Sequence, residues 1–175
     1  MRVVAGLAKG RRLVAPRGGV TRPTSDFVRE AIFNTLVSYA DIEGATVLDL
    51  FAGTGALGIE SLSRGAAQAT FVDHDRRAAA AIRSNLASTG LGPAQVHQSE
   101  VLRWLARSRS PGFDIVFADP PYRWAGWPDL LGCLRAGLLV AEAGAEVDVG
   151  EQWQLLKVKR YGDTFVTLTT PRSRP

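Results

Sequence analysis

The chain has 175 residues, 46% of them hydrophobic and 22% charged, with a formal net charge of +4, which predicts one globular domain with a core of its own. No apolar run approaches the ~20 residues of a membrane helix, and the first residues lack a signal-peptide pattern, so we expect a cytoplasmic protein. A single cysteine, Cys133, and two histidines exclude an intrachain disulfide and supply no metal-ligand cluster, so no metal is expected.

The positive charge is concentrated at the N-terminus. Residues 1–25 carry six basic side chains and no acidic one, whereas residues 26–175 carry 15 basic and 17 acidic side chains. Such a segment suits contacts with phosphate groups, although a charge run taken alone is more often a solvated tail. We therefore divide the chain into a basic extension over residues 1–24 and a main domain over residues 25–175. The basic residues of the extension are Arg2, Lys9, Arg11, Arg12, Arg17 and Arg22.

The extension is predicted to form two short strands, 3–5 and 12–15, joined by residues 6–10. Thr24 or Ser25 is suited to cap the helix that follows, with Asp26 in its positive first turn. Apolar residues recur in that helix at helical spacing and predict a stripe that faces the core. The stripe consists of Phe27, Ala31, Ile32 and Leu36.

From residue 46 onward, short apolar strands alternate with helices, an order typical of parallel βαβ units. Predicted strands cover residues 46–51, 69–75, 95–98, 113–121 and 138–143, and predicted helices cover 56–64, 76–89, 101–107 and 130–136. Residues 153–170 indicate two further strands around a Gly162–Asp163 turn, which must be antiparallel. The predicted fold is α/β, with a mostly parallel sheet of seven strands that ends in an antiparallel hairpin.

A glycine-rich segment, DLFAGTGALG at residues 49–58, follows the first of these strands. Glycines at this place let backbone N–H groups and a helix N-terminus approach a ligand, at the edge where open α/β sheets bind cofactors. Gly53, Gly55 and Gly58 also match the G-x-G-x-x-G pattern, so a dinucleotide site is an alternative. The glycines alone do not decide between the two.

Two acidic residues stand at the end of the second strand. Asp73 lies twenty residues after Gly53, where a carboxylate accepts hydrogen bonds from ribose hydroxyls, although it also suits an ordinary strand-end turn. Asp75 is assigned instead as the cap of the helix that begins at Arg76.

The motif Asp119–Pro120–Pro121–Tyr122 follows the apolar strand at residues 115–118. Two prolines remove two N–H donors and leave carbonyls that only accept, and Asp119 adds a further acceptor. An exocyclic amino group, which has two N–H bonds to donate, suits such a set of acceptors. Tyr122 is suited to stack on the base that carries this group. A polar turn with a packed tyrosine is the alternative interpretation.

Together these motifs resemble a known family. The pair DLFAGTG and DPPY is similar to class I S-adenosylmethionine-dependent amino-methyltransferases. The longer segments RVVAGLAKGRRL, RPTSDFVREAIFN, DLFAGTGALGIESLSRGA and FDIVFADPPY resemble the RsmD family, which methylates N2 of one guanine in 16S ribosomal RNA. The resemblance covers nearly the whole chain and implies a Rossmann-like class I methyltransferase fold with S-adenosylmethionine as cofactor.

The resemblance also implies roles for individual residues. Asp73 would bind the ribose hydroxyls of the cofactor, and Ser99 and Glu100 would meet its adenine, although Glu100 equally suits a helix cap. Asp119 and the carbonyl of Pro120 would accept hydrogen bonds from guanine N2, with Tyr122 stacked on the base. The methionine end of the cofactor would be held by Asp49, Phe51, Ala52, Gly53, Thr54 and Gly55.

The implied partner is 16S ribosomal RNA organised in an assembling or assembled 30S subunit. The basic extension would grip its phosphates beside the active site, and the protein is expected to act as a monomer. Trp124 and Trp127 suit either a contact with RNA or packing in the core.

Three other functions share part of this pattern. An adenine-N6 DNA methyltransferase has the same acceptor motif, but no recognition domain is left over here. A noncatalytic RNA-binding protein with a methyltransferase fold would not need the intact motifs. An NAD-dependent oxidoreductase accounts for the glycines but not for Asp119 and Tyr122.

Overall fold

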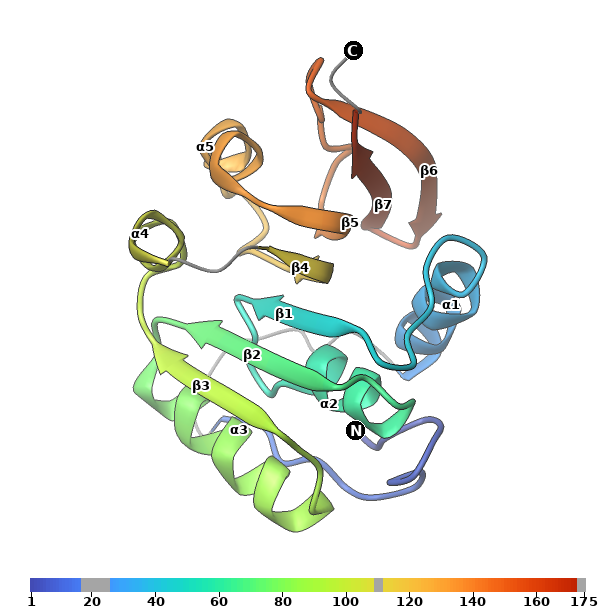
Figure 1. Cartoon of the computed structure of the whole chain (residues 1–175), viewed down its shortest axis with the longest axis vertical. Helices are drawn as coiled ribbons and strands as arrows, with labels where there is room; N and C mark the ends of the chain where they lie inside the picture. Colours follow the sequence, from blue (N-terminus) through green and yellow to red (C-terminus); the bar gives the residue numbers. More distant parts are fainter. Residues whose placement is uncertain (17–25, 109–111, 173–175) are drawn as a thin grey trace.

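The computed structural model describes residues 1–16, 26–108 and 112–172. Seven strands form one sheet in the order β3-β2-β1-β4-β5-β7-β6 (Figure 1). The first five strands are parallel, and β7 pairs antiparallel with both β5 and β6, as the sequence predicts. The strands are β1 (Thr46–Leu50), β2 (Gln68–Asp73), β3 (Ala94–Gln98), β4 (Phe113–Ala118), β5 (Ala136–Ala143), β6 (Trp153–Tyr161) and β7 (Thr164–Pro171).

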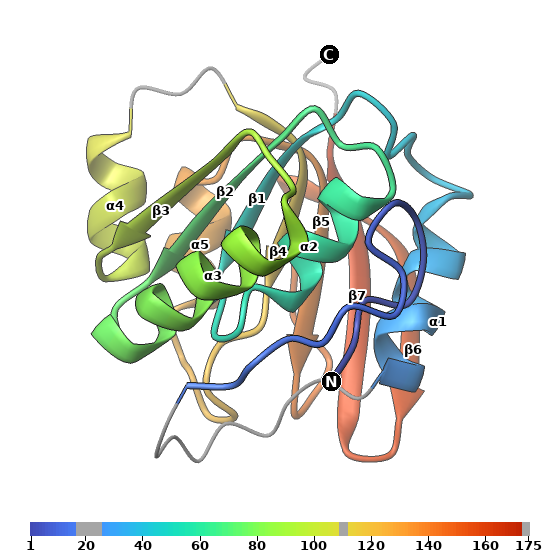
Figure 2. The ribbon, with the colours of Figure 1, turned by 90° about the horizontal axis from the view of Figure 1, so that it is seen from below.

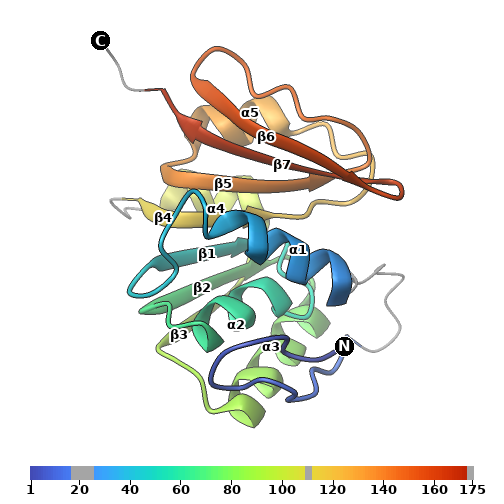
Figure 3. The same ribbon diagram turned by 90° about the vertical axis from the view of Figure 1, so that its right-hand side faces the viewer.

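Five helices cover the two faces of this sheet (Figure 3). One face carries α1 (Asp26–Leu36), α2 (Ala56–Ser63) and α3 (Arg76–Thr89), and the other carries α4 (Val101–Arg107) and α5 (Trp127–Cys133). Successive residues of β1 point to opposite faces of the sheet, so that Val47 packs in the core on the α1 face and Leu48 in the core on the α5 face. Phe33 of α1 reaches Phe117 of β4, with 5.6 Å between ring centroids. No helix in the described ranges is long and apolar enough to cross a membrane.

The N-terminal segment, residues 1–16, packs on α2 and α3 (Figure 3). Val3, Ala8 and Leu13 are buried in the same core as α1 and α2. The two predicted strands reduce to one isolated bridge, Arg2 with Arg12, so that expectation was too regular. The physical reason is that, although Val3 and Leu13 donate to carbonyls across the two arms, the next N–H groups along the chain donate to side chains of the main domain, which ends the ladder.

A buried ion pair fixes the start of this segment. Glu60 of α2 accepts the N–H groups of Val4 at 2.7 Å and Ala5 at 2.9 Å. Arg29 of α1 donates to the carbonyl of Arg2 and lies 3.7 Å from Glu60, and both charged side chains are fully buried. Buried charges of this kind are stable only when they are paired and hydrogen-bonded.

Two expectations on the helices were wrong. The predicted helix 130–136 is α5, which begins at Trp127 and ends at Cys133, because Pro128 suits a first helical turn and the chain turns into β5 after Leu134. Phe27 does not face the core, since its side chain is 70% exposed on the first turn of α1. The caps proposed at Thr24 and Ser25 lie outside the described residues.

Candidate active site

Four neighbouring strands end at the same edge of the sheet, and the predicted site residues follow them. The glycine loop, residues 51–55, follows β1; Asp73 ends β2; Ser99 and Glu100 follow β3; and the segment 119–122 follows β4. Because these strands are parallel, their carboxyl ends meet at one edge, which is where open α/β sheets bind ligands. The sequence therefore predicted correctly which segments come together (Figure 2).

The glycine loop turns sharply between β1 and α2. Phe51 has a φ of 56°, a left-handed conformation that is rare for a residue other than glycine, and Gly55 has a φ of 75°. Gly58 has no room for a side chain, because a Cβ there would overlap the ring of Phe71. The glycines thus allow the sharp turn into α2 and the close packing of this helix on β2.

Asp49 lies beneath this loop. Its side chain is 2% exposed, and its Oδ2 accepts the N–H of Gly58 at 2.9 Å. The pKa of this carboxyl is raised to about 8, mainly by burial; the Gly58 hydrogen bond partly offsets the rise, and the nearby charges of Asp119 and Asp73 add to it. A buried carboxyl in this state is stabilised as the anion by any cation that binds near it.

Asp73 connects β2 to the glycine loop. Its Oδ2 accepts the N–H of Gly53 and its Oδ1 accepts the N–H of Asp75, both at 2.8 Å. Each carboxylate oxygen accepts more than one hydrogen bond, so a ligand hydroxyl can be bound in addition. Asp75 caps α3 by accepting the N–H of Arg77, as predicted.

Ser99 and Glu100 lie at the start of α4. Glu100 caps this helix by accepting the N–H groups of Leu102 at 3.3 Å and Arg103 at 2.9 Å, so its interpretation as a helix cap is confirmed. Ser99 donates its backbone N–H to the carbonyl of Asp73 at 2.9 Å and so ties this turn to β2. The adenine contact of these two residues stays a prediction.

The residues of the acceptor segment, 119–122, differ in how deeply they are buried. Pro120 is buried, Asp119 is half-buried, and Tyr122 is 65% exposed. The ring of Tyr122 lies against Gly144, just after β5, where a Cβ would overlap the ring. Sequence analysis missed Gly144, and its only signal was a glycine directly after an apolar strand.

An aromatic cluster joins the glycine loop to the segment after Tyr122. Phe51 and Trp124 meet edge to face with 5.0 Å between centroids, and Trp124 meets Trp127 in the same way at 5.5 Å. All three are half-buried against the core beneath α4 and α5. The structure thus favours packing over an RNA contact for Trp124 and Trp127. The contact with Trp124 also accounts for the left-handed backbone of Phe51, which places its ring in this cluster.

Asn85 of α3 is a second residue that sequence analysis missed. Its Nδ2 donates to the carbonyls of Thr54 at 2.9 Å and Val14 at 3.0 Å, and its Oδ1 accepts the N–H of Val14 at 2.9 Å. The buried amide therefore links the N-terminal segment to the glycine loop. No sequence motif marks such a contact between residues 71 positions apart.

The basic residues of the extension are placed in part. Arg2, Lys9, Arg11 and Arg12 are exposed, and Arg17 and Arg22 lie outside the described residues. The bridge of Arg2 with Arg12 lies toward the glycine loop, because Thr54 donates its Oγ1 to the Sδ of neighbouring Met1 at 3.4 Å. Across the described ranges, no group of three potential ligands is arranged to hold a metal.

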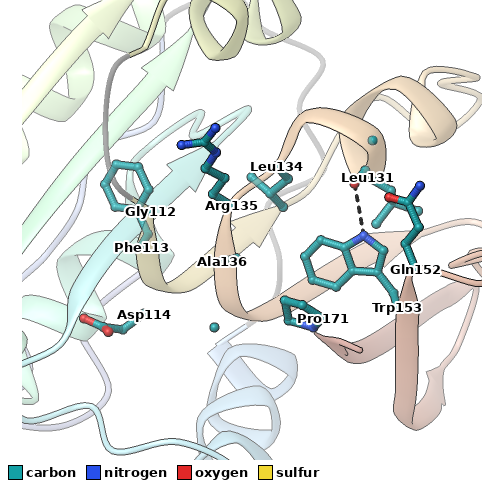
Figure 4. Close-up of a pocket in the computed structure, with 12 residues that line it drawn as sticks. Gly112, Phe113, Asp114, Leu131, Leu134, Arg135, Ala136, Gln152, Trp153 and Pro171 are labelled. Carbon is teal, nitrogen blue, oxygen red and sulfur yellow. Dashed lines mark hydrogen bonds between the residues drawn. The ribbon is translucent and has the colours of Figure 1, made fainter. Parts of the chain in front are cut away.

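A hollow of about 600 Å³ lies at the opposite edge of the sheet (Figure 4). It lies between the starts of β4 and β5 and includes Arg135 and Trp153, whose Nε1 donates to the carbonyl of Leu131 at 3.0 Å. None of the predicted site residues lines it. We therefore place the active site by its chemistry at the carboxyl edge and not in this hollow.

Known proteins with similar sequences and structures support this fold. Residues 1–170 match the family described as Conserved hypothetical protein 95. The chain is 42% identical to YlbH of Bacillus subtilis (strain 168) over 98% of this chain and 100% of that protein. It is 44% identical to "Ribosomal RNA small subunit methyltransferase D" of Escherichia coli (strain K12), over 70% of this chain and 61% of that protein. The solved structure of yhhF from Escherichia coli matches with a TM-score of 0.86 and 34% identity over 99% of both chains.

Proposed function

Because the chain belongs to the Conserved hypothetical protein 95 family, as its resemblance to RsmD implied, we propose that it methylates N2 of a guanine in 16S ribosomal RNA with S-adenosylmethionine as donor. The observation that carries this proposal is the meeting of two motifs at one sheet edge. A glycine loop suited to a cofactor follows β1, and an acceptor segment suited to an amino group follows the adjacent β4.

The residues at this edge fit S-adenosylmethionine. Its cationic methionine end suits a position near Asp49, a buried carboxyl that accepts the N–H of Gly58 and has the acids Asp119 and Asp73 nearby. Asp73 offers carboxylate oxygens to the ribose hydroxyls of the cofactor, and the backbone of residues 51–55 lies next to Asp73 at the same edge of the sheet. The bound sulfonium supplies an activated methyl group, so the chain itself needs only to bind, orient and exclude water.

The acceptor segment fits the guanine amino group. Asp119 and the Pro120 carbonyl accept its two N–H bonds, which directs the nitrogen lone pair toward the methyl carbon. In this arrangement Asp119 and the Pro120 carbonyl would hold the amino group while it takes the methyl group, and Asp119 or water would accept the proton that the nitrogen then loses. Orientation and electrostatic support of this kind account for large rate effects without a strong base.

The target base has to leave its stack to reach this edge, so an unpaired or flipped nucleotide is the expected substrate. Tyr122 offers an exposed ring for stacking on it. Arg2, Lys9, Arg11 and Arg12 are proposed to bind phosphates of the same RNA, with Arg17 and Arg22 continuing that role. The proposed substrate is RNA in an assembling 30S subunit, with the enzyme acting as a monomer.

The deciding experiment supplies the protein and methyl-labelled S-adenosylmethionine with naked 16S ribosomal RNA and with assembled 30S subunits that lack the modification. We expect label in one guanine, identified by nuclease digestion and mass spectrometry as N2-methylguanine. An adenine-N6 DNA methyltransferase would instead label duplex DNA at adenine. No label in any of these substrates, with cofactor binding intact, would support a noncatalytic RNA-binding protein.

A further inference from the structure

The turn between β6 and β7 lies at the catalytic edge of the sheet. Strand register fixes this position, because Phe165 of β7 pairs with Ala143, the last residue of β5. Gly144 comes next, and the ring of Tyr122 lies against it. The hairpin tip therefore lies at the same edge of the sheet as the end of β5, on which Tyr122 packs.

Aromatic rings and cations alternate over both faces of this tip. On one face, Phe27 of α1 meets Tyr161 edge to face at 6.2 Å, and the Lys159 ammonium lies 5.0 Å from the Tyr161 ring centre. On the other face, the Arg160 guanidinium lies 5.4 Å from the ring centre of Phe165. We call these five residues the hairpin-tip patch.

The patch is exposed in a way that folding alone does not explain. Phe27 is 70% exposed although it stands on a helix whose other apolar residues reach the core, and Lys159 and Arg160 are both exposed. Its acidic neighbours are Asp26, which pairs with Arg29 at 2.8 Å, and Asp163 in the turn. The exposed ring and Lys159 on one face of the tip, with Arg160 on the other, suit a ligand that passes around the tip and has both flat apolar faces and negative charge.

We propose that the hairpin-tip patch binds the RNA strand next to the target nucleotide, with Phe27 stacking on a base and Lys159 and Arg160 contacting phosphates. This inference rests on the proposed function and adds a second RNA surface to the N-terminal extension. Single-stranded RNA is recognised in this way, by bases stacked on aromatic side chains and a backbone that follows cationic groups. The target base would then stack on Tyr122, while the N-terminal extension and the hairpin-tip patch bind the RNA on either side of it.

The charges are tested in the full chain by titrating labelled naked 16S ribosomal RNA at several salt concentrations. The double variant Lys159→Gln/Arg160→Gln should bind RNA more weakly and flatten the slope of log affinity against log salt by about 1.4, the value for two phosphates of a single strand. Arg160→Lys alone should leave the slope of the unchanged protein as it is, because it keeps the charge.

A matched control removes two exposed cations from the opposite edge of the sheet. Arg107 ends α4 and Arg135 precedes β5, so Arg107→Gln/Arg135→Gln has the same change in net charge far from the catalytic edge. Its salt slope should equal that of the unchanged protein. Equal slopes for the two double variants would overturn the role of Lys159 and Arg160.

Stacking is tested separately with Phe27→Ala. This change should weaken RNA binding by about fivefold or more, without a change in salt slope, because stacking does not release counterions. Val37→Ala removes a similarly exposed apolar group beyond the far end of α1 and should have no effect. RNA binding is measured here separately from methyl transfer. If neither the unchanged protein nor any variant transferred methyl groups, that result would count against the proposed function alone. If Phe27→Ala bound RNA as well as the unchanged protein, the stacking role would be overturned.

Discussion

The Oδ2 of Asp73 accepts the backbone N–H of Gly53 at 2.8 Å, so the acid that ends β2 holds the glycine loop that follows β1. This contact gives Asp73 two tasks, since it positions the loop and also offers a lone pair to a ligand. Removing the side chain should therefore affect both the loop and the cofactor.

We expect Asp73→Ala to weaken S-adenosylmethionine binding by roughly tenfold or more, because a charge-assisted hydrogen bond and the loop geometry are lost together. Isothermal titration calorimetry measures this directly. Asp75→Ala is the matched control, since Asp75 caps α3 and does not bond to the loop. It should lower the melting temperature and leave the affinity unchanged; equal losses of affinity in the two variants would contradict the role of Asp73.

Asp119→Ala should lower the rate of methyl transfer by about 100-fold or more while cofactor affinity changes little, because the acceptor acts mainly as the amino group is attacked. Single-turnover transfer of labelled methyl to RNA measures the rate. Asp119→Asn retains one acceptor oxygen and should lose less. Full activity of Asp119→Ala would remove this residue from the mechanism.

The buried carboxyl of Asp49 should make the unliganded protein less stable as pH rises. Its pKa is about 8 in the fold against 3.8 in an ordinary setting, so the folded state binds more protons between these values and the free energy of unfolding falls from pH 4 toward pH 8. Urea unfolding at several pH values should show this fall for the unchanged protein. Asp49→Asn keeps an acceptor for Gly58 and should remove its contribution; identical pH profiles would show that the carboxyl is ionised throughout.

Glu60→Ala should destabilise the protein by about 3–5 kcal/mol, because two backbone N–H groups lose their charged acceptor and the buried Arg29 loses one of its two acidic neighbours, keeping Asp26 at 2.8 Å. Hydrogen exchange should quicken at Val4 and Ala5, which bond to Glu60. Glu30→Ala removes an exposed acid from the same region and should change stability little. A stable Glu60→Ala variant with slow exchange at both amides would show that other contacts hold the segment.

Gly144→Ala should displace the ring of Tyr122, because the added Cβ has no room beside it. We expect KM for RNA to rise by about fivefold or more while cofactor affinity stays the same, since the proposed role of Tyr122 is to stack on the base and not on the cofactor. Gly132→Ala is the control, because a Cβ there meets no atom within 4 Å. An unchanged KM would separate Tyr122 from substrate binding.

Local signals predicted the bounds of some helices to the residue. The helices 76–89 and 101–107 lie as predicted, because Asp75 and Glu100 cap their starts and Gly90 allows the left-handed end of the first. The start of α5 was predicted three residues too late, because the prediction relied on the apolar residues of this helix. Pro128, which lies in the first helical turn, indicates the earlier start.

Long-range contacts could not be predicted in this way. The pair Arg29–Glu60 and the contact of Tyr122 with Gly144 join segments whose separation along the chain leaves no periodic pattern. Phe27 was expected in the core because helical spacing shows which residues share a face, but not where the core ends along the helix axis. These contacts depend on how the elements pack, which only the fold decides.

The attachment of residues 1–16 to Glu60, Ser63 and Asn85 has a consequence for the cost of binding. A charged tail that orders itself on its ligand loses conformational entropy at that moment, and this loss is subtracted from the affinity. Here this entropy is already lost during folding, so Arg2 and Arg12 would make their proposed phosphate contacts from a segment that is already held in place.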